Sequence, residues 1–156
     1  MIPNKKTILI LLAIAAVVLC TLPLLVKDKD TLYIKVAQEL TANEKQFLKA
    51  LEKQGIKTVK HNENAPKDAY VLWFYPPEQA LTLQNTPTEQ TDFIYTDAYY
   101  PFEWRDLKRL PVMLTPHQKL YEHYMRSNIK SAVLDIKEPN AAARFAEIYQ
   151  WLKANR

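Results

Sequence analysis

The sequence predicts a single α/β domain with a mostly parallel sheet, preceded by an N-terminal transmembrane helix. Predicted strands and helices alternate along residues 32–156, which is typical of a three-layer α/β fold. The segment 69–75 (AYVLWFY) is continuously apolar, as expected for a strand buried on both faces in a parallel sheet. An uncharged run begins at Thr7 and ends at Val26, with lysines on both sides, and at about 1.5 Å per residue it can cross a bilayer. The predicted organisation is therefore a tail (1–6), an anchor (7–26), a linker (27–31) and one globular domain (32–156).

The first half of the domain has clear boundary signals. The segment 32–37 alternates apolar and polar residues like a strand. Thr41 and Glu44 have the spacing of a capping box, so we predict that a helix begins there. Gly55 is expected to end this helix, because glycine readily adopts the positive φ of the position that follows a helix. Further strands are expected over 56–60 and 69–75.

In the second half, prolines stand where helices after strands are expected to begin, at Pro77, Pro101, Pro116 and Pro139. Thr115 and Gln118 have the spacing of a second capping box. Strands are predicted over 93–96, 111–114 and 131–136, helices over 78–83, 102–107, 117–126 and 139–154, and a polar loop over 84–91. The sequence does not determine the strand order, so flavodoxin-like and Rossmann-like orders are both open.

The apolar run has three possible fates, which are an uncleaved anchor, a cleaved secretory signal and a lipoprotein signal. No small-x-small cleavage motif stands at its end. Cys20 follows Leu19, whereas the bacterial lipobox has a small residue before its cysteine. We therefore predict an uncleaved single-pass anchor. The slight excess of positive charge before the run predicts a bacterial inner-membrane protein with its C-terminal domain outside the cytoplasm.

Composition excludes several functional classes. Gly55 is the only glycine in the sequence, which excludes glycine-rich dinucleotide and phosphate loops and the G-x-S-x-G nucleophile elbow. His61, His117 and His123 lack metal-ligand spacing, and no cysteine follows Cys20, so we expect neither a metal nor a cofactor. The net charge of +4 comes partly from lysines beside the anchor, and no basic cluster with interleaved aromatics predicts nucleic acid as a partner.

Candidate binding residues follow the predicted strands, because ligands of open α/β sheets bind beyond the carboxyl ends of strands. The densest segment is 96–106, where aromatic and acidic side chains alternate. The predicted binding residues are Asp97, Tyr99, Tyr100, Glu103, Trp104 and Thr115. Such side chains can bind a partner protein or a saccharide. In the competing interpretation Trp104 is simply core and Glu103 complements a helix dipole.

Two functions are consistent with these features. The favoured one is a non-enzymatic binding or accessory module of the cell envelope, with a protein or a saccharide as its partner. The alternative is a glycan-acting enzyme or a glycosyltransferase-like half-domain that needs a partner chain. Asp97 and Glu103 are then the nominated pair of carboxylates, since glycoside hydrolysis uses two of them across a cleft.

Overall fold

A computed structural model describes residues 31–36, 39–61, 65–75, 91–97 and 110–155 of the chain. These residues form one sheet of six strands in which every pairing is parallel, and they include three helices. The elements are β1 (Leu32–Val36), α2 (Ala42–Lys53), β2 (Thr58–Lys60), β3 (Tyr70–Phe74), β4 (Phe93–Tyr95), β5 (Val112–Thr115), α3 (Gln118–Arg126), β6 (Ser131–Val133) and α4 (Ala141–Ala154). The prediction of an α/β domain with a parallel sheet is confirmed.

The strand order is β2-β1-β3-β4-β5-β6. This is the flavodoxin-like order with one more strand at its end, and the direction of winding reverses between β1 and β3. The structure thus decides between the two orders that the sequence left open.

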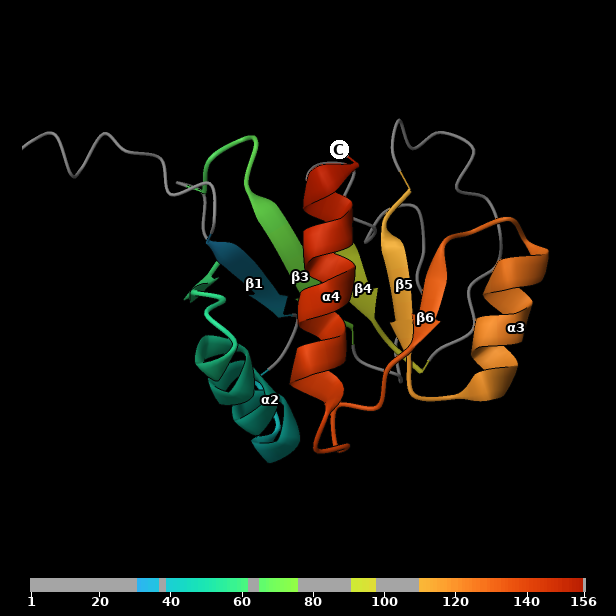
Figure 1. The fold of residues 1–156 in the computed structure, drawn as a ribbon, viewed down its shortest axis with the longest axis horizontal. Coiled ribbons are helices and arrows are strands. Elements are labelled where there is room, and N and C mark those ends of the chain that lie inside the picture. The colour runs from blue at the N-terminus through green and yellow to red at the C-terminus, as the bar shows by residue number, and fades with distance from the viewer. Residues whose placement is uncertain (1–30, 37–38, 62–64, 76–90, 98–109, 156) are drawn as a thin grey trace, which may run out of the picture.

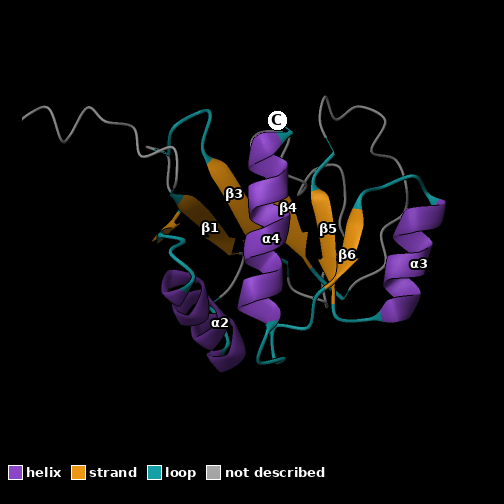
Figure 2. Ribbon diagram, in the orientation of Figure 1, coloured by secondary structure: helices purple, strands orange, loops and turns teal. Residues whose placement is uncertain are grey.

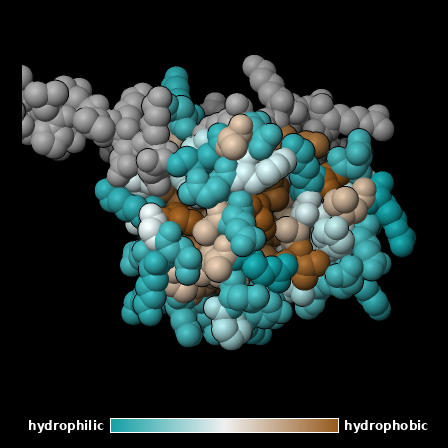
Figure 3. Space-filling view, viewed as in Figure 1, coloured by the Kyte–Doolittle hydropathy of each residue, from teal (hydrophilic) through white to brown (hydrophobic). Residues whose placement is uncertain are grey.

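The described helices cover both faces of the sheet. Helices α2 and α4 lie on one face, where they pack against each other and enclose the larger apolar core (Figures 1 and 2). Helix α3 packs on the opposite face against a smaller core around Trp73, Ile94 and Met113. Seen from the α2 and α4 side, the outward surfaces of the helices are polar, and apolar side chains show in the spaces between them (Figure 3).

The local signals at α2 are confirmed. Thr41 caps the helix by accepting a hydrogen bond from the Glu44 amide at 3.3 Å, and the Glu44 carboxylate accepts one from the Thr41 amide at 2.7 Å. Gly55 has a φ of +80° after the end of the helix. The predicted second strand is shorter than expected because the Ile56 amide still donates to Leu51 and completes the helix end.

The second predicted capping box is wrong. His117 is the residue that precedes α3, and its side chain makes no capping hydrogen bond. Thr115 instead ends β5, and its hydroxyl oxygen accepts a hydrogen bond from the His117 amide at 3.2 Å. Because the Thr115 hydroxyl oxygen is bound to the His117 amide, it does not cap the first amides of α3, and α3 begins without a side-chain cap. At the other end of α3, Asn128 adopts a φ of 60°.

The predicted helices over 78–83 and 102–107 and the predicted anchor over 7–26 lie outside the described residues. In the part of the chain that the structure does describe, no helix has the length and apolar character needed to cross a membrane.

Candidate functional site

Asp97 and the start of α3 line one hollow at the carboxyl edge of the sheet, the edge where the strands end. Strands β4 and β5 are parallel neighbours, so the residues that follow them lie side by side. The hollow has a volume of about 370 Å³. Its lining residues are Asp97, Pro116, His117, Gln118, Lys119 and Leu120. The structure therefore brings Asp97 together with the turn that follows Thr115.

Thr115 itself is fully buried and is not one of the residues that line this hollow. Its hydroxyl oxygen holds the His117 amide and so fixes the path of the chain from β5 into α3. The exposed side chains of His117, Gln118 and Lys119 follow from this turn. Thr115 acts on the hollow through the backbone rather than by facing it.

The hollow combines a carboxylate with the start of a helix. The first amides of a helix have no acceptor within the helix, and its N-terminus carries a partial positive charge. A bound anion would gain from these amides but would be repelled by the Asp97 carboxylate. A hydroxyl group can donate to Asp97 and accept from an amide, so this arrangement suits a neutral, hydroxyl-bearing ligand.

Acidic side chains also surround Tyr95 at this edge. Burial raises the pKa of the Tyr95 phenol far above its ordinary value, and the negative charges of Asp135, Asp97 and Glu44 raise it further. A backbone hydrogen bond with Ile136 acts in the opposite direction. The phenol therefore stays protonated at neutral pH, and three carboxylates contribute to this.

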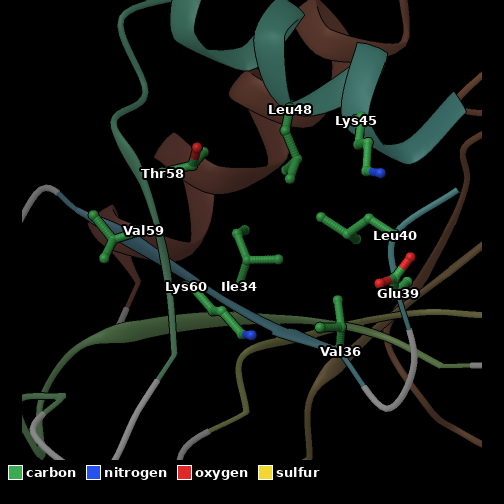
Figure 4. A pocket seen from close by; sticks show the side chains of 9 residues that line it. All are labelled: Ile34, Val36, Glu39, Leu40, Lys45, Leu48, Thr58, Val59 and Lys60. Atoms are coloured by element: carbon green, nitrogen blue, oxygen red, sulfur yellow. The ribbon is translucent and has the colours of Figure 1, made fainter. Parts of the chain in front are cut away.

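A larger groove of about 560 Å³ lies between α2 and the ends of β1 and β2. Its lining residues are Ile34, Val36, Glu39, Leu40, Lys45, Leu48, Thr58, Val59 and Lys60. Figure 4 shows Ile34, Leu40 and Leu48 pointing into the same space, with Lys45 on the α2 side and Lys60 on the β2 side. The groove thus has an apolar floor and a charged rim.

The groove is bordered by a strand at the edge of the sheet. In the part of the sheet that the structure describes, β2 pairs with β1 and with no strand on its other side. Val59 in the middle of β2 is 39% exposed. The groove was missed by reasoning from the sequence, because its walls come from segments that each look like ordinary amphipathic structure.

Lys35 is a second feature that the sequence analysis did not select. It lies on the opposite face of the sheet from α2, with its Nζ atom 5.2 Å from the ring centre of Trp73. Burial lowers the pKa of Lys35, and burial together with the positive charge of Lys35 lowers the pKa of His61. A lysine within the otherwise apolar strand sequence LYIKV was the available signal.

The remaining predicted binding residues, Tyr99, Tyr100, Glu103 and Trp104, lie outside the described residues. Within the described ranges, no three or more His, Cys, Asp or Glu side chains form a group able to hold a metal ion. The geometry thus gives two candidate binding places, the polar hollow at α3 and the apolar groove at β2. Comparison with known proteins finds no matching family model, no matching curated protein and no matching solved structure.

Proposed function

We propose that the protein is a membrane-anchored binding module that holds an extended segment of a partner protein in the groove beside β2. The observation that carries the proposal is the combination of this apolar groove with an edge strand. Extended peptides bind such edges by adding a strand, where main-chain hydrogen bonds give affinity and neighbouring pockets give specificity.

The backbone of β2 has the direction that strand addition needs. The Lys57 carbonyl accepts from the Leu32 amide at 2.8 Å, and the His61 amide donates to the Ile34 carbonyl at 2.9 Å. Residues 57 and 61 therefore direct these groups toward β1. Because successive residues of a strand direct their backbone groups to alternate sides, Thr58 and Lys60 direct theirs away from β1.

The charges at the rim indicate the chemistry of the partner. Lys45 and Lys60 lie on opposite sides of the groove, whereas Glu39 is the single acidic residue among the described residues that line it. An incoming segment with apolar side chains flanked by acidic ones complements this arrangement. A second copy of the chain is a poor occupant, because edge-to-edge pairing would bring Lys57 and Lys60 of both copies to one seam.

The anchor is the second part of the proposal. The assignment of the uncharged run 7–26 as an uncleaved anchor is supported by its length, its flanking lysines and the absence of a cleavage motif. In this proposal the anchor holds the domain at the bacterial inner membrane, outside the cytoplasm. A reporter enzyme fused to the C-terminus tests this topology. Activity of a reporter that works only in the cytoplasm would contradict it.

Strand addition is tested with a photo-crosslinking amino acid in place of Val59, in the full chain in its native membrane. We expect a discrete protein adduct from this position and none from the matched exposed position Gln150 on α4. Thr58→Pro removes the outward N–H of the first β2 residue, a position where an edge strand tolerates proline. We expect Thr58→Pro and Lys60→Glu each to abolish the adduct. Equal adducts from both positions, or an adduct that survives both substitutions, would overturn the proposal.

A saccharide in the hollow at α3 is a second candidate, favoured by the pairing of the Asp97 carboxylate with a helix start. Titration of the full chain in detergent with soluble envelope glycan fragments tests it. Asp97→Ala is then expected to abolish binding, and Thr58→Pro to leave it unchanged. The glycan-acting enzyme that the sequence offered as an alternative depends on Glu103, which lies outside the described residues.

A further inference from the structure

Three of the large apolar side chains that are exposed lie toward the amino edge of the sheet, where the strands begin. Leu110, Met125 and Trp151 are 44%, 50% and 45% exposed. Leu110 precedes β5, Met125 lies in the last turn of α3, and Trp151 lies near the end of α4. Since each described helix runs antiparallel to the strands, helix ends and strand starts share one edge, which is the upper edge in Figure 1.

Basic side chains accompany them at the same edge. They belong to helix ends and to the segments that lead into strands, and they are Lys53, Lys57, Lys67, Arg126, Lys130 and Lys153. The Lys130 Nζ atom lies 4.7 Å from the ring centre of Trp151, so a cation and an exposed aromatic ring form one unit. Glu52 and Asp68 are the exposed acidic residues among the described residues here, and basic groups outnumber them.

The chain enters the domain at this same edge. Thr31 directly precedes β1, and residues 27–30 separate it from the end of the uncharged run. An extended chain spans at most about 3.6 Å per residue, so these residues reach roughly 14 Å. If the run crosses a bilayer, the amino edge lies within this distance of the bilayer surface.

From these three observations we infer that the amino edge docks onto the surface of the bilayer and holds the domain in a fixed orientation. Tryptophan is enriched at the membrane interface, and each lysine or arginine near an anionic surface contributes about 1 kcal/mol of attraction. The orientation directs the carboxyl edge, with its hollow, away from the membrane. The inference rests on the proposed anchor, and it goes beyond it because an anchor alone leaves the domain free to rotate.

Quenching of tryptophan fluorescence tests this contact. The full chain is reconstituted into vesicles of phosphatidylcholine with phosphatidylglycerol, with and without lipids brominated near the headgroup. Both proteins carry Trp104→Phe, so that Trp73 and Trp151 are the tryptophans compared. We expect bromine to quench this protein more than the same protein with Trp151→Phe, since Trp73 is buried and the second variant loses the exposed ring. Equal quenching of both proteins would overturn the inference.

A matched pair of charge reversals identifies the source of the attraction. Lys67→Glu combined with Lys130→Glu changes the amino edge, and Lys49→Glu combined with Lys137→Glu makes the same change of charge elsewhere. We expect only the first pair to lose the Trp151-dependent quenching, and we expect vesicles of phosphatidylcholine alone to weaken it in the wild type. Loss of this quenching in both pairs of variants would contradict an attraction that is specific to the amino edge.

Extraction at alkaline pH separates this inference from the anchor itself. Release of the chain from membranes would contradict the anchor. Retention of the chain without Trp151-dependent quenching would leave the anchor intact and contradict the docked edge.

Discussion

The two edges of the sheet differ in chemistry although the same strands form both. The amino edge has exposed apolar side chains and a majority of basic groups, with Trp151 beneath Lys130 as its most distinctive pair. The carboxyl edge has Glu44, Asp97 and Asp135 around the protonated Tyr95 phenol, together with the hollow at α3. Lys45, Lys60 and Lys119 also lie at the carboxyl edge, so the two edges differ in their balance of charge and in their exposed apolar side chains.

Part of this difference follows from the topology alone. Each of the three described helices begins at the carboxyl edge and ends at the amino edge. Helix dipoles favour acidic residues at helix starts and basic residues at helix ends. Glu44 in α2 and Lys53 and Lys153 at helix ends fit this rule. Lys67 and Lys130 lie outside helices, and Leu110 has no charge, so the dipole does not account for them. The basic and apolar surface of the amino edge is therefore more extensive than the helix dipoles alone would produce.

The largest expected effect tests whether the two edges share one cooperative core. Phe145 is fully buried, and its ring centre lies 5.9 Å from that of Phe47 and 5.0 Å from that of Phe93. We expect Phe145→Ala to lower the free energy of unfolding by about 3–5 kcal/mol, because it leaves a cavity among aromatic rings. Urea unfolding, monitored by circular dichroism and by tryptophan fluorescence, measures this loss. Separate transitions for the two signals would contradict a single cooperative core.

The two aspartates that flank β4 compare the amino and carboxyl edges directly, with a smaller expected effect on the free energy of unfolding. Asp92 at the amino edge is 2% exposed, and its Oδ2 atom accepts from the Val71 amide at 2.9 Å. Asp97 at the carboxyl edge is exposed. We expect Asp92→Ala to cost about 1–3 kcal/mol of stability because it leaves a buried amide without its acceptor.

Asp97→Ala is expected to change stability by less than about 0.5 kcal/mol, as is usual for exposed positions. Asp92→Asn keeps an acceptor oxygen and serves as the control. Comparable losses from Asp92→Ala and Asp97→Ala in urea unfolding would show that Asp97 has a structural role, which would weaken its assignment to a binding hollow.

The smallest expected effect is a dependence of stability on pH at the carboxyl end of β2. Burial and the nearby Lys35 lower the pKa of His61 below its ordinary 6.5 in the folded chain. The unfolded chain therefore binds more protons at mildly acidic pH, and the contribution of His61 to stability falls as the pH falls through 6.5. We expect His61→Gln to reduce the loss of stability between about pH 8 and pH 5. An unchanged pH profile in thermal unfolding of the variant would contradict the assignment.

Much of the local structure was predictable from the sequence. The capping box at Thr41, the end of α2 at Gly55 and the doubly buried β3 each depend on residues close together in the chain, so their signals are visible there. The capping box expected at Thr115 failed because the spacing alone does not reveal that Thr115 closes β5 and uses its hydroxyl for the next turn. The rule that parallel strands end at one edge predicted that Asp97 and Thr115 lie at the same edge. Their position side by side depends on the pairing of β4 with β5, which the sequence left open.

By itself the sequence determined the α/β class, the approximate extent of most described elements and the absence of glycine-rich nucleotide loops. Propensity, capping and hydrophobic period are local properties, which is why they could be recognised without the fold. Only the tertiary structure decided the strand order, the apolar groove beside β2 and the grouping of Leu110, Met125 and Trp151 on one edge. These features join residues far apart in the chain, and they depend on which strands pair and on which face each helix packs.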